Sequence, residues 1–484
     1  MFVTSGSDQN EIEPVMTEIT EFDIAETEAG DETGGIDRWI GEARALLRLA
    51  GPMVGTQLAM MAIMTTDVVM LGRLSKEALA GAALGNTVFF FAWLLGMGPT
   101  AAISPMIAHI LGASPNDRAG VRAVTRMGLW SAAALSVPLM VLLLCTKYIL
   151  LALGQQPALA EAASQFTRPL CIGLPFSLGF QCLRNYASAL SKPNAALWVV
   201  ALTIMFNAFG DYALIFGHFG MPKLALVGSG IATASSHTFC FLMMTGVVFV
   251  DRDLRKYRIL RRFSRPDWSK FAELFRLGMP IGLTMIFEAM LFASATLLMG
   301  TFGTASVAAH QIAINVPSIT FMVPLGVAMA ATVRVGLAAG AGDRAGVRRA
   351  GYTAILISVG FMSLCSLLLA TFPRQIAELY FSSGQAANAD AIALTVVFLH
   401  VAAAFQIVDG IQVTAALSLR GLKDARAPMW IAGASYWLAG FPLCVYLGIG
   451  LGMKGLGVWI GLAFALLVAA TCMCWRFYHL TREP

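Results

Sequence analysis

Four carboxylic acids lie inside long apolar stretches of the chain: Asp67, Asp211, Glu288 and Asp409. A charge at the centre of a bilayer costs about 2.5 to 3.5 kcal/mol even on a lenient insertion scale, so an acid in such a stretch is a candidate for function. Carboxylate oxygens in a cavity suit a proton relay and a hard monovalent cation equally well. The residue types leave these two chemistries open, and the alternative for any single acid is a neutral, hydrogen-bonded carboxyl that the fold tolerates.

The spacing of two polar residues suggests partners for the first acid. Asn207 and Asp211 are four residues apart, so on a helix both side chains lie on one face and could meet Asp67. Sodium could therefore bind at Asp67, Asn207 and Asp211, or at Glu288 and Asp409. A cationic organic compound would compete with the inward-moving cation for such a negative site, which is the physical basis of antiport. One charge crossing 100 mV supplies about 2.3 kcal/mol, equivalent to a concentration ratio near fifty.

The elements that carry these acids are membrane helices. Apolar residues make up 57% of the chain, charged residues only 13%, and the mean hydropathy is +0.72. In soluble proteins about a quarter of the residues are charged. Glycine and proline within the segments, as in Leu94–Pro105, predict helices with bends. Apolar windows of about 20 residues predict twelve membrane spans: 46–71, 79–111, 128–152, 167–190, 195–217, 225–250, 274–301, 306–338, 351–373, 393–418, 429–449 and 455–477.

The first 37 residues differ from the rest of the chain. They contain eleven Asp and Glu and no Lys or Arg, which predicts an acidic, disordered tail rather than a domain or a signal peptide. The net charge of +5 hides this asymmetry, because outside the tail 33 basic residues face 17 acidic ones. The predicted organisation is a cytoplasmic tail (1–37), an N-lobe of spans 1–6 (38–250), a basic cytoplasmic linker (251–273) and a C-lobe of spans 7–12 (274–484).

Basic residues predict the orientation. If the N-terminus is cytoplasmic, the tail and the even-numbered connections carry 26 Lys and Arg against 7 in the odd-numbered connections, so the positive-inside rule places both termini in the cytoplasm. Arg184 and Arg334 lie near predicted cytoplasmic ends of spans, where we expect them to snorkel. The densest basic stretch, Asp251–Lys270, is interpreted as a topology anchor in contact with anionic lipid, in preference to a nucleic-acid site.

One polar hexapeptide occurs twice in the chain. The sequence DRAGVR stands at Asp117–Arg122 and at Asp343–Arg348, in two predicted cytoplasmic connections six spans apart. We expect both aspartates to cap the helices that follow, and the alternative is a charged gate at the cytoplasmic side. Further matches at an offset of 228 indicate a duplication of six spans, a parallel repeat typical of transporters with two facing bundles: Leu47–Gly55 with Phe275–Leu283, Gly72 with Gly300, and Gly96–Ala102 with Pro324–Ala330.

Three separated stretches agree in order and spacing with one known family: TTDVVMLGRLSKEALAGAALG (Thr65–Gly85), EAMLFASATLLMGTFGTASVAAHQIAINVPSITFMVPLGVAMAATVRVG (Glu288–Gly336) and DGIQVTAALSLRGLKDARAPM (Asp409–Met429). They closely resemble the multidrug and toxic compound extrusion (MATE) family in its bacterial NorM-type branch. The likeness covers about residues 45–478. It implies an all-α integral membrane protein with twelve helices in two six-helix lobes around a V-shaped cavity, in a bacterial inner membrane, exporting cationic drugs in exchange for Na⁺ or H⁺.

The same resemblance assigns expected roles to nine residues. Asp67 matches the acid of the N-lobe, Glu288 and Asp409 match the acids of the C-lobe, and two residues belong to an AHQ motif, in which a histidine of the core is the alternative to a transport role. Having Asn207 and Asp211 beside a NorM-like C-lobe mixes features of different branches, so the lobe that holds the coupling site stays open. The remaining matches are the N-lobe partners Asn185, Asn207, Asp211 and Thr233 and the AHQ pair His310 and Gln311.

Other functions are less consistent with the sequence. A flippase of lipid-linked saccharides has a related architecture but would need a strongly cationic cavity for pyrophosphate, whereas the charges placed within the spans are mainly acidic. Paired histidine ligands, a nucleophile elbow and a phosphate loop of the form GxxxxGK are not found, which argues against a membrane enzyme and against ATP coupling. We therefore expect no cofactor, a monomer, and as partners small cationic compounds and membrane lipids but no nucleic acid.

Overall fold

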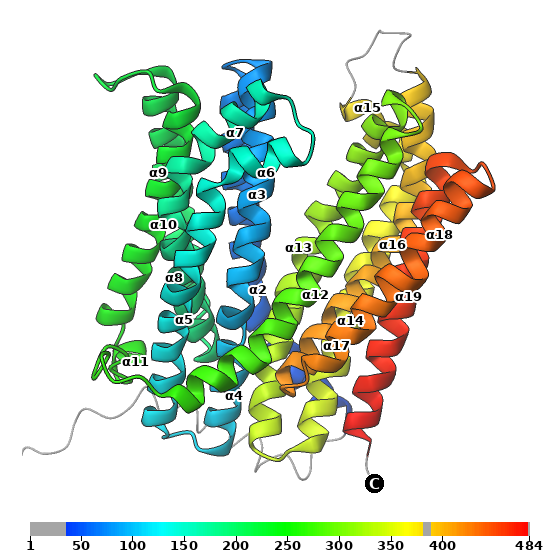
Figure 1. Ribbon diagram of the computed structural model, residues 1–484. Helices are drawn as coiled ribbons and strands as arrows, with labels where there is room; N and C mark the ends of the chain where they lie inside the picture. The colour runs from blue at the N-terminus through cyan, green and yellow to red at the C-terminus, as the bar shows by residue number, and fades with distance from the viewer. Residues whose placement is uncertain (1–34, 381–388, 483–484) are drawn as a thin grey trace, which may run out of the picture.

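The computed structural model describes residues 35–380 and 389–482, and its regular elements are helices. Figure 1 shows two groups of helices that approach each other at the side where the C-terminus lies and diverge towards the opposite side. We call the side where the first helix begins and the last one ends the terminal side. The predicted acidic tail up to residue 34 lies outside the described residues, while Gly35–Asp37, assigned to that tail from the sequence, already belong to the first helix.

The first group of helices is the N-lobe. Its second membrane span bends as the sequence predicts: Pro99 lies in the last turn of one helix, and the next begins after Ala102. The N-lobe elements are α2 (Gly35–Gly72), α3 (Lys76–Ala101), α4 (Ile103–Ala113), α5 (Arg118–Leu144), α6 (Thr146–Ala152), α7 (Pro157–Leu170), η2 (Cys171–Gly173), α8 (Leu174–Ala189), α9 (Asn194–Phe216), α10 (Ala225–Val250) and the short α11 (Arg252–Arg255).

The second group is the C-lobe, which repeats the same order of long helices. Its penultimate span contains two π-helical segments, each closed by a glycine. The elements are α12 (Trp268–Gly300), α13 (Thr304–Gly340), α14 (Arg344–Thr371), α15 (Pro373–Tyr380), α16 (Ala389–Gly421), α17 (Arg426–Gly433), η4 (Ala434–Gly440), α18 (Phe441–Val445), η5 (Tyr446–Gly450) and α19 (Lys454–Thr481).

Eleven of the spans in the described residues are helices, some with a bend, that are long and apolar enough to cross a membrane. The twelfth predicted span, 167–190, is formed by α7 and α8, joined by the 3₁₀ turn η2. Pro169 and Pro175 flank this turn, and because proline has no backbone N–H, it cannot continue the hydrogen-bond ladder of a helix. The two repeated aspartates do cap helices, as predicted: Asp117 accepts from the backbone N–H groups of Ala119 and Gly120, and Asp343 accepts from that of Gly346.

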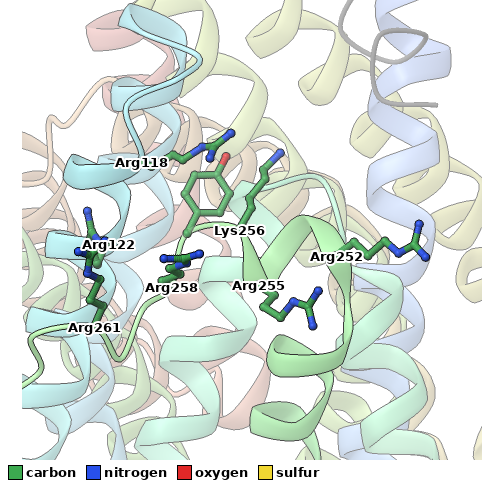
Figure 2. Close-up of a pocket in the computed structure, with 8 residues that line it drawn as sticks. Arg118, Arg122, Arg252, Arg255, Lys256, Arg258 and Arg261 are labelled. Carbon is green, nitrogen blue, oxygen red and sulfur yellow. The ribbon is translucent and has the colours of Figure 1, made fainter. Parts of the chain in front are cut away.

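The linker between the lobes, residues 251–267, folds back against the start of α5. Figure 2 shows basic residues of this linker beside Arg118 and Arg122 of α5. The helix α12 starts at Trp268 and is capped by Asp267, so the last six residues of the predicted linker are helical.

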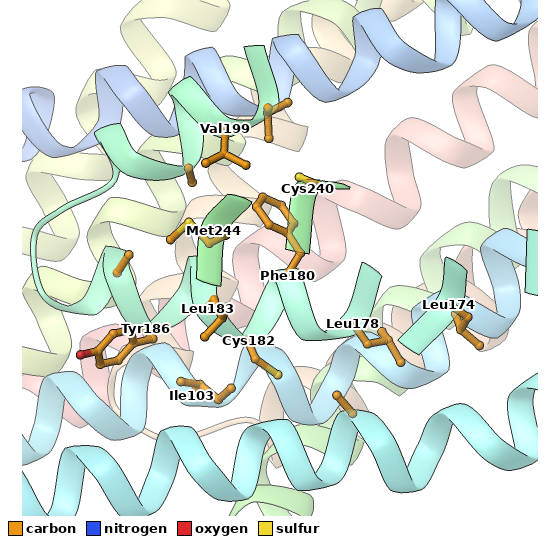
Figure 3. Close-up of a cluster of buried hydrophobic side chains, with 14 of the residues drawn as sticks. Ile103, Leu174, Leu178, Phe180, Cys182, Leu183, Tyr186, Val199, Cys240 and Met244 are labelled. Atoms are coloured by element: carbon orange, nitrogen blue, oxygen red, sulfur yellow. The ribbon is translucent and has the colours of Figure 1, made fainter. Parts of the chain in front are cut away.

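Each lobe has its own apolar core. At the terminal side, the first half of the first helix of each lobe packs against the other lobe. Figure 3 shows the part of the N-lobe core between α4, α8, α9 and α10. The first half of α12 also enters this core through Leu274, Leu277 and Ile281. Conversely, the first half of α2 packs on α13 and α14 of the C-lobe through residues 46–53. The first halves of α2 and α12 thus each pack against the helices of the other lobe.

Glycines allow these crossings, and they do so at repeat-related positions. A Cβ at Gly98 of α3 would collide with the backbone of α12 at Gly278 and Gly282. A Cβ at Gly326 of α13 would collide with the backbone of α2 at Val54. Positions 98 and 326, and positions 54 and 282, are each separated by 228, the offset found in the sequence. The duplication thus preserves the same close helix contact in both lobes.

Candidate functional site

The N-lobe gathers four of the predicted residues near the side opposite the termini. Asp67 lies on α2 and Thr233 on α10, and the Thr233 hydroxyl donates a long hydrogen bond of 3.4 Å to Oδ2 of Asp67. Asn207 and Asp211 come from α9, are fully buried and lie within electrostatic range of Asp67. We call these four residues the N-lobe acid cluster.

The N-lobe acid cluster holds two carboxylates and no basic group. Among residues 35–380 and 389–482, the only charged side chain that acts on Asp211 is Asp67, and the side chains that act on Asp67 are Asp211, Asn207 and Thr233. Within the described residues, the carboxylate oxygens of Asp211 and both polar atoms of the Asn207 side chain lack a hydrogen-bond partner. Two adjacent carboxylates, one half-buried on Asp67 and one fully buried on Asp211, cannot both be ionised at low cost. The arrangement is therefore incomplete without a proton or a cation.

The C-lobe gathers Glu288 of α12 and Asp409 of α16, and adds groups that the sequence analysis missed. Arg420, also on α16, lies in electrostatic range of Glu288. Tyr436 of η4 is fully buried beside these charges, and its hydroxyl accepts a hydrogen bond of 3.0 Å from Nε2 of Gln412. We call these five residues the C-lobe acid cluster. It differs from the N-lobe acid cluster because a guanidinium already offsets part of its negative charge.

The two clusters also lie at different depths. Asp67 and Asp211 are each five residues from the end of their helix on the side opposite the termini, which corresponds to about 7.5 Å along the axis. Glu288 and Asp409 are each twelve residues from the nearer end of a 33-residue helix, near the middle of the span. A cation that enters from the side opposite the termini therefore reaches the N-lobe acid cluster first.

The AHQ motif lies outside both clusters. His310 is fully buried in the C-lobe, with Nε2 3.2 Å from the hydroxyl of Thr296 and its ring edge-on to Trp459 at 5.7 Å. These contacts are those of a histidine in a packed core. Gln311, the next residue on α13, is exposed.

Asn185 is not brought to Asp67. Its Nδ2 donates a hydrogen bond of 2.8 Å to the carbonyl oxygen of Thr100, where α3 bends into α4. The neighbouring Arg184 contacts Gln57, which lies ten residues, or about 15 Å, below Asp67 on α2. Asn185 thus supports the bend of the second span rather than the N-lobe acid cluster.

The expectation that Arg184 snorkels to the membrane surface is wrong. Its side chain is 4% exposed, and Nη1 donates a hydrogen bond of 2.8 Å to Oε1 of Gln57. The guanidinium also contacts the sulfur atoms of Met60 on α2 and Met329 on α13. Because the lobes meet on the terminal side, the helices α2 and α13 cover the path by which Arg184 would reach solvent. Arg184 therefore joins the two lobes.

A second arginine also links the two lobes on the terminal side. Arg334 of α13 forms a two-point ion pair with Glu42 of α2, with Nε to Oε1 at 2.9 Å and Nη2 to Oε2 at 2.7 Å. Nearby, Nε2 of His109 in α4 lies 2.9 Å from the carbonyl oxygen of Gly421 at the end of α16. Polar contacts thus reinforce the glycine-mediated packing that holds the lobes together on the terminal side.

A family model described as MatE matches the chain twice, over residues 52–213 and 280–446. The chain belongs to the MatE family. One match begins in the first helix of each lobe, and the two starting points are 228 residues apart, as the internal repeat requires. The family predicted from the sequence is confirmed, and membership identifies the chain as a membrane transporter rather than an enzyme.

Known relatives of this MatE protein span most of its length. A "Probable multidrug resistance protein NorM" of Mesorhizobium japonicum is 44% identical over 445 residues, which is 92% of this chain and 95% of the relative. A protein of the same name from Brucella suis is 40% identical over 91% of this chain and 94% of its own. The crystal structure of the eukaryotic MATE transporter AtDTX14 has the same fold, with a TM-score of 0.80 at 20% identity over 90% of this chain and 96% of that one.

Proposed function

We propose that this MatE protein is a multidrug exporter that moves cationic or amphipathic organic compounds out of the cell in exchange for Na⁺ or H⁺. The names of the NorM relatives support the export of drugs. The transporter needs no cofactor, because the coupling ion and the membrane potential supply the free energy.

The Asp67–Asp211 pair carries this proposal. Two adjacent carboxylates without a basic neighbour attract one proton or one sodium ion, since either would remove the repulsion between them. The carboxylate and amide oxygens of Asp67, Asp211 and Asn207 are the hard ligands that sodium prefers, and the same carboxylates can hold a proton. We assign ion coupling to this cluster. The C-lobe acid cluster, with Arg420 in place, then contributes mainly to substrate binding.

The way in which the lobes meet supports alternating access. The half of each lobe on the terminal side is packed against the other through α2, α12 and the close glycine contacts, and the opposite halves diverge (Figure 1). Twenty-six of the 33 basic residues lie on or near the terminal side, which supports a cytoplasmic location for both termini in a bacterial inner membrane. The described conformation then faces outward. Inward opening requires separating Glu42 from Arg334 and α3 from α12.

The test is ethidium movement in proteoliposomes that contain the purified protein, under an imposed sodium gradient and, separately, an imposed pH gradient. We expect one gradient to drive accumulation and the other to have no effect, which would identify the ion. If neither gradient moves any cationic dye, the proposal fails. Movement of a labelled lipid-linked saccharide in the same liposomes would then favour a flippase.

A further inference from the structure

The basic linker is anchored to the N-lobe by alternate residues. Tyr257 and Ile259 are buried in the N-lobe core, and the hydroxyl of Tyr186 donates a hydrogen bond of 2.6 Å to the carbonyl oxygen of Leu254. Between and beyond these anchors, Arg258 and Arg261 are exposed. The linker thus presents a fixed row of guanidinium groups rather than a loose chain.

Two adjoining hollows lie between this linker and the start of α5. The first has a volume of 690 Å³ and is lined by six arginines, one lysine and Tyr257; seven of these residues are labelled in Figure 2. The second has a volume of 670 Å³ and is lined by five arginines, by Trp268, by small apolar residues and by Asp267, the acid that caps α12. Arg122 of α5 and Arg261 of the linker line both hollows. These two residues are the centre of the basic surface.

In the part of the chain that the structure describes, the arginines of the first hollow are not paired with acids. Its six arginines form no ion pair within residues 35–380 and 389–482. The closest acids are already engaged, because Asp251 caps α11 and Asp253 forms an ion pair of 2.6 Å with Lys192. Burial lowers the pKa of Lys256, and the positive charges of Arg118 and Lys192 oppose the effect of Asp253 and Asp251, which raise it. Such a concentration of like charge is stabilised by a bound anion.

Exposed apolar residues beside the hollows indicate where this anion comes from. Leu260 and Phe263 of the linker and Trp268 at the start of α12 are 46%, 38% and 65% exposed, and arginines of the linker lie between them in the sequence. Aromatic side chains of this kind lie at the level of lipid headgroups in membrane proteins. A freely soluble anion would not make use of these apolar groups, whereas a phospholipid offers a phosphate and an acyl chain side by side.

We propose that the two hollows form a binding site for the headgroup of an anionic phospholipid. Arg122 and Arg261 bind its phosphate, since a guanidinium presents paired donors that match phosphate oxygens. The exposed Leu260, Phe263 and Trp268 contact the start of its acyl chains. Because the linker connects α10 to α12, the bound lipid fixes the connection between the two lobes to the start of α5.

The experiment measures phospholipid retained by the full-length protein after delipidation in detergent and incubation with vesicles of phosphatidylcholine, alone or mixed with phosphatidylglycerol. Native mass spectrometry counts the bound lipids. We expect selective retention of phosphatidylglycerol by the wild type. The double variant Arg122→Gln, Arg261→Gln should bind it with about a thirty-fold weaker affinity, because each of the two arginines strengthens the binding of an anionic headgroup about fivefold.

The internal repeat supplies a matched control. Arg344 and Arg348 occupy in α14 the positions of Arg118 and Arg122 in α5, and neither of them lines either hollow. The double variant Arg344→Gln, Arg348→Gln should retain phosphatidylglycerol like the wild type. If the Arg122 variant does not fold, the exposed Arg261→Gln alone should still weaken binding about fivefold.

Three results would overturn the proposal. The first is equal retention of phosphatidylglycerol by the wild type and by the variants of Arg122 and Arg261. The second is displacement of the lipid by inorganic phosphate at equal concentration, which would indicate a site for free phosphate. The third is lipid retention only after deletion of residues 1–34, which would indicate that the acidic segment occupies the hollows.

Discussion

The two acid clusters are built on the same duplicated scaffold but differ in charge. The N-lobe acid cluster has two carboxylates and no base, whereas the C-lobe acid cluster pairs Glu288 with Arg420. The acids do not occupy equivalent positions either: the residue 228 positions after Asp67 is Ala295, which is buried in the C-lobe core. Duplication kept the helix crossings, and the chemistry diverged. In the N-lobe acid cluster, no guanidinium of the described residues offsets the carboxylates, which is why we propose this cluster as the site of ion coupling.

The largest effect is expected from removing the base of the C-lobe. The substitution Arg420→Met leaves Glu288 without its positive neighbour and should lower the free energy of unfolding by about 3 kcal/mol. Adding Glu288→Gln should restore most of this loss, because the repulsion disappears with the charge. Thermal unfolding in detergent measures both. If the second substitution restores nothing, Arg420 does not compensate Glu288, and the contrast between the lobes is lost.

The control for this experiment is Arg374→Gln, which removes an exposed ion pair of 2.9 Å with Glu378 at the opposite side of the molecule. Its effect should stay below about 0.5 kcal/mol.

An effect of opposite sign is expected in the N-lobe. Asp211→Asn removes one of two adjacent carboxylates and supplies an amide that can donate to Asp67, so stability in the absence of the coupling ion should rise by about 1 kcal/mol. Asn207→Asp, which adds a third acid beside the pair, should lower stability. The same unfolding measurement compares them, and a loss of stability in Asp211→Asn would show that the two carboxylates do not repel each other.

The smallest effect concerns Thr233. Its hydrogen bond to Asp67 is 3.4 Å long and therefore weak. Thr233→Val should raise the ion concentration for half-maximal transport about twofold, whereas Thr233→Ser, which keeps the hydroxyl, should match the wild type. A tenfold change for Thr233→Val would instead make the hydroxyl a principal ligand.

Much of the fold could be predicted because apolar length and internal repetition are local properties of the sequence. The twelve spans, the bend near Pro99 and the helix caps at Asp117 and Asp343 all follow from such signals. The packing of the first halves of α2 and α12 against the opposite lobe could not be predicted, because it depends on which helix surfaces meet. For the same reason Arg184 was expected at the surface, although α2 and α13 enclose it.

The candidate sites show the same limit. Asn207 and Asp211 are four residues apart on one helix, and the structure places both beside Asp67. Arg420 carried an unused signal, since it lies eleven residues, about three turns, after Asp409 and so on the same face of α16. No pattern in the sequence pointed to Tyr436, because the position of its side chain depends on the π-helical turn that contains it. Asn185 matched the family pattern, but its hydrogen bond goes to the bend at Thr100.

The most direct test of the central claim, that the N-lobe acid cluster couples the ion, is ethidium accumulation in proteoliposomes under the driving gradient for Asp67→Asn and for Glu288→Gln. With 100 mV across the membrane, one coupled charge supports an accumulation ratio of about fifty. We predict that Asp67→Asn lowers this ratio to about one, the value without coupling, and that Glu288→Gln retains gradient-driven accumulation even if more substrate is needed. Coupled accumulation that persists in Asp67→Asn and disappears in Glu288→Gln would contradict the account and place the ion in the C-lobe.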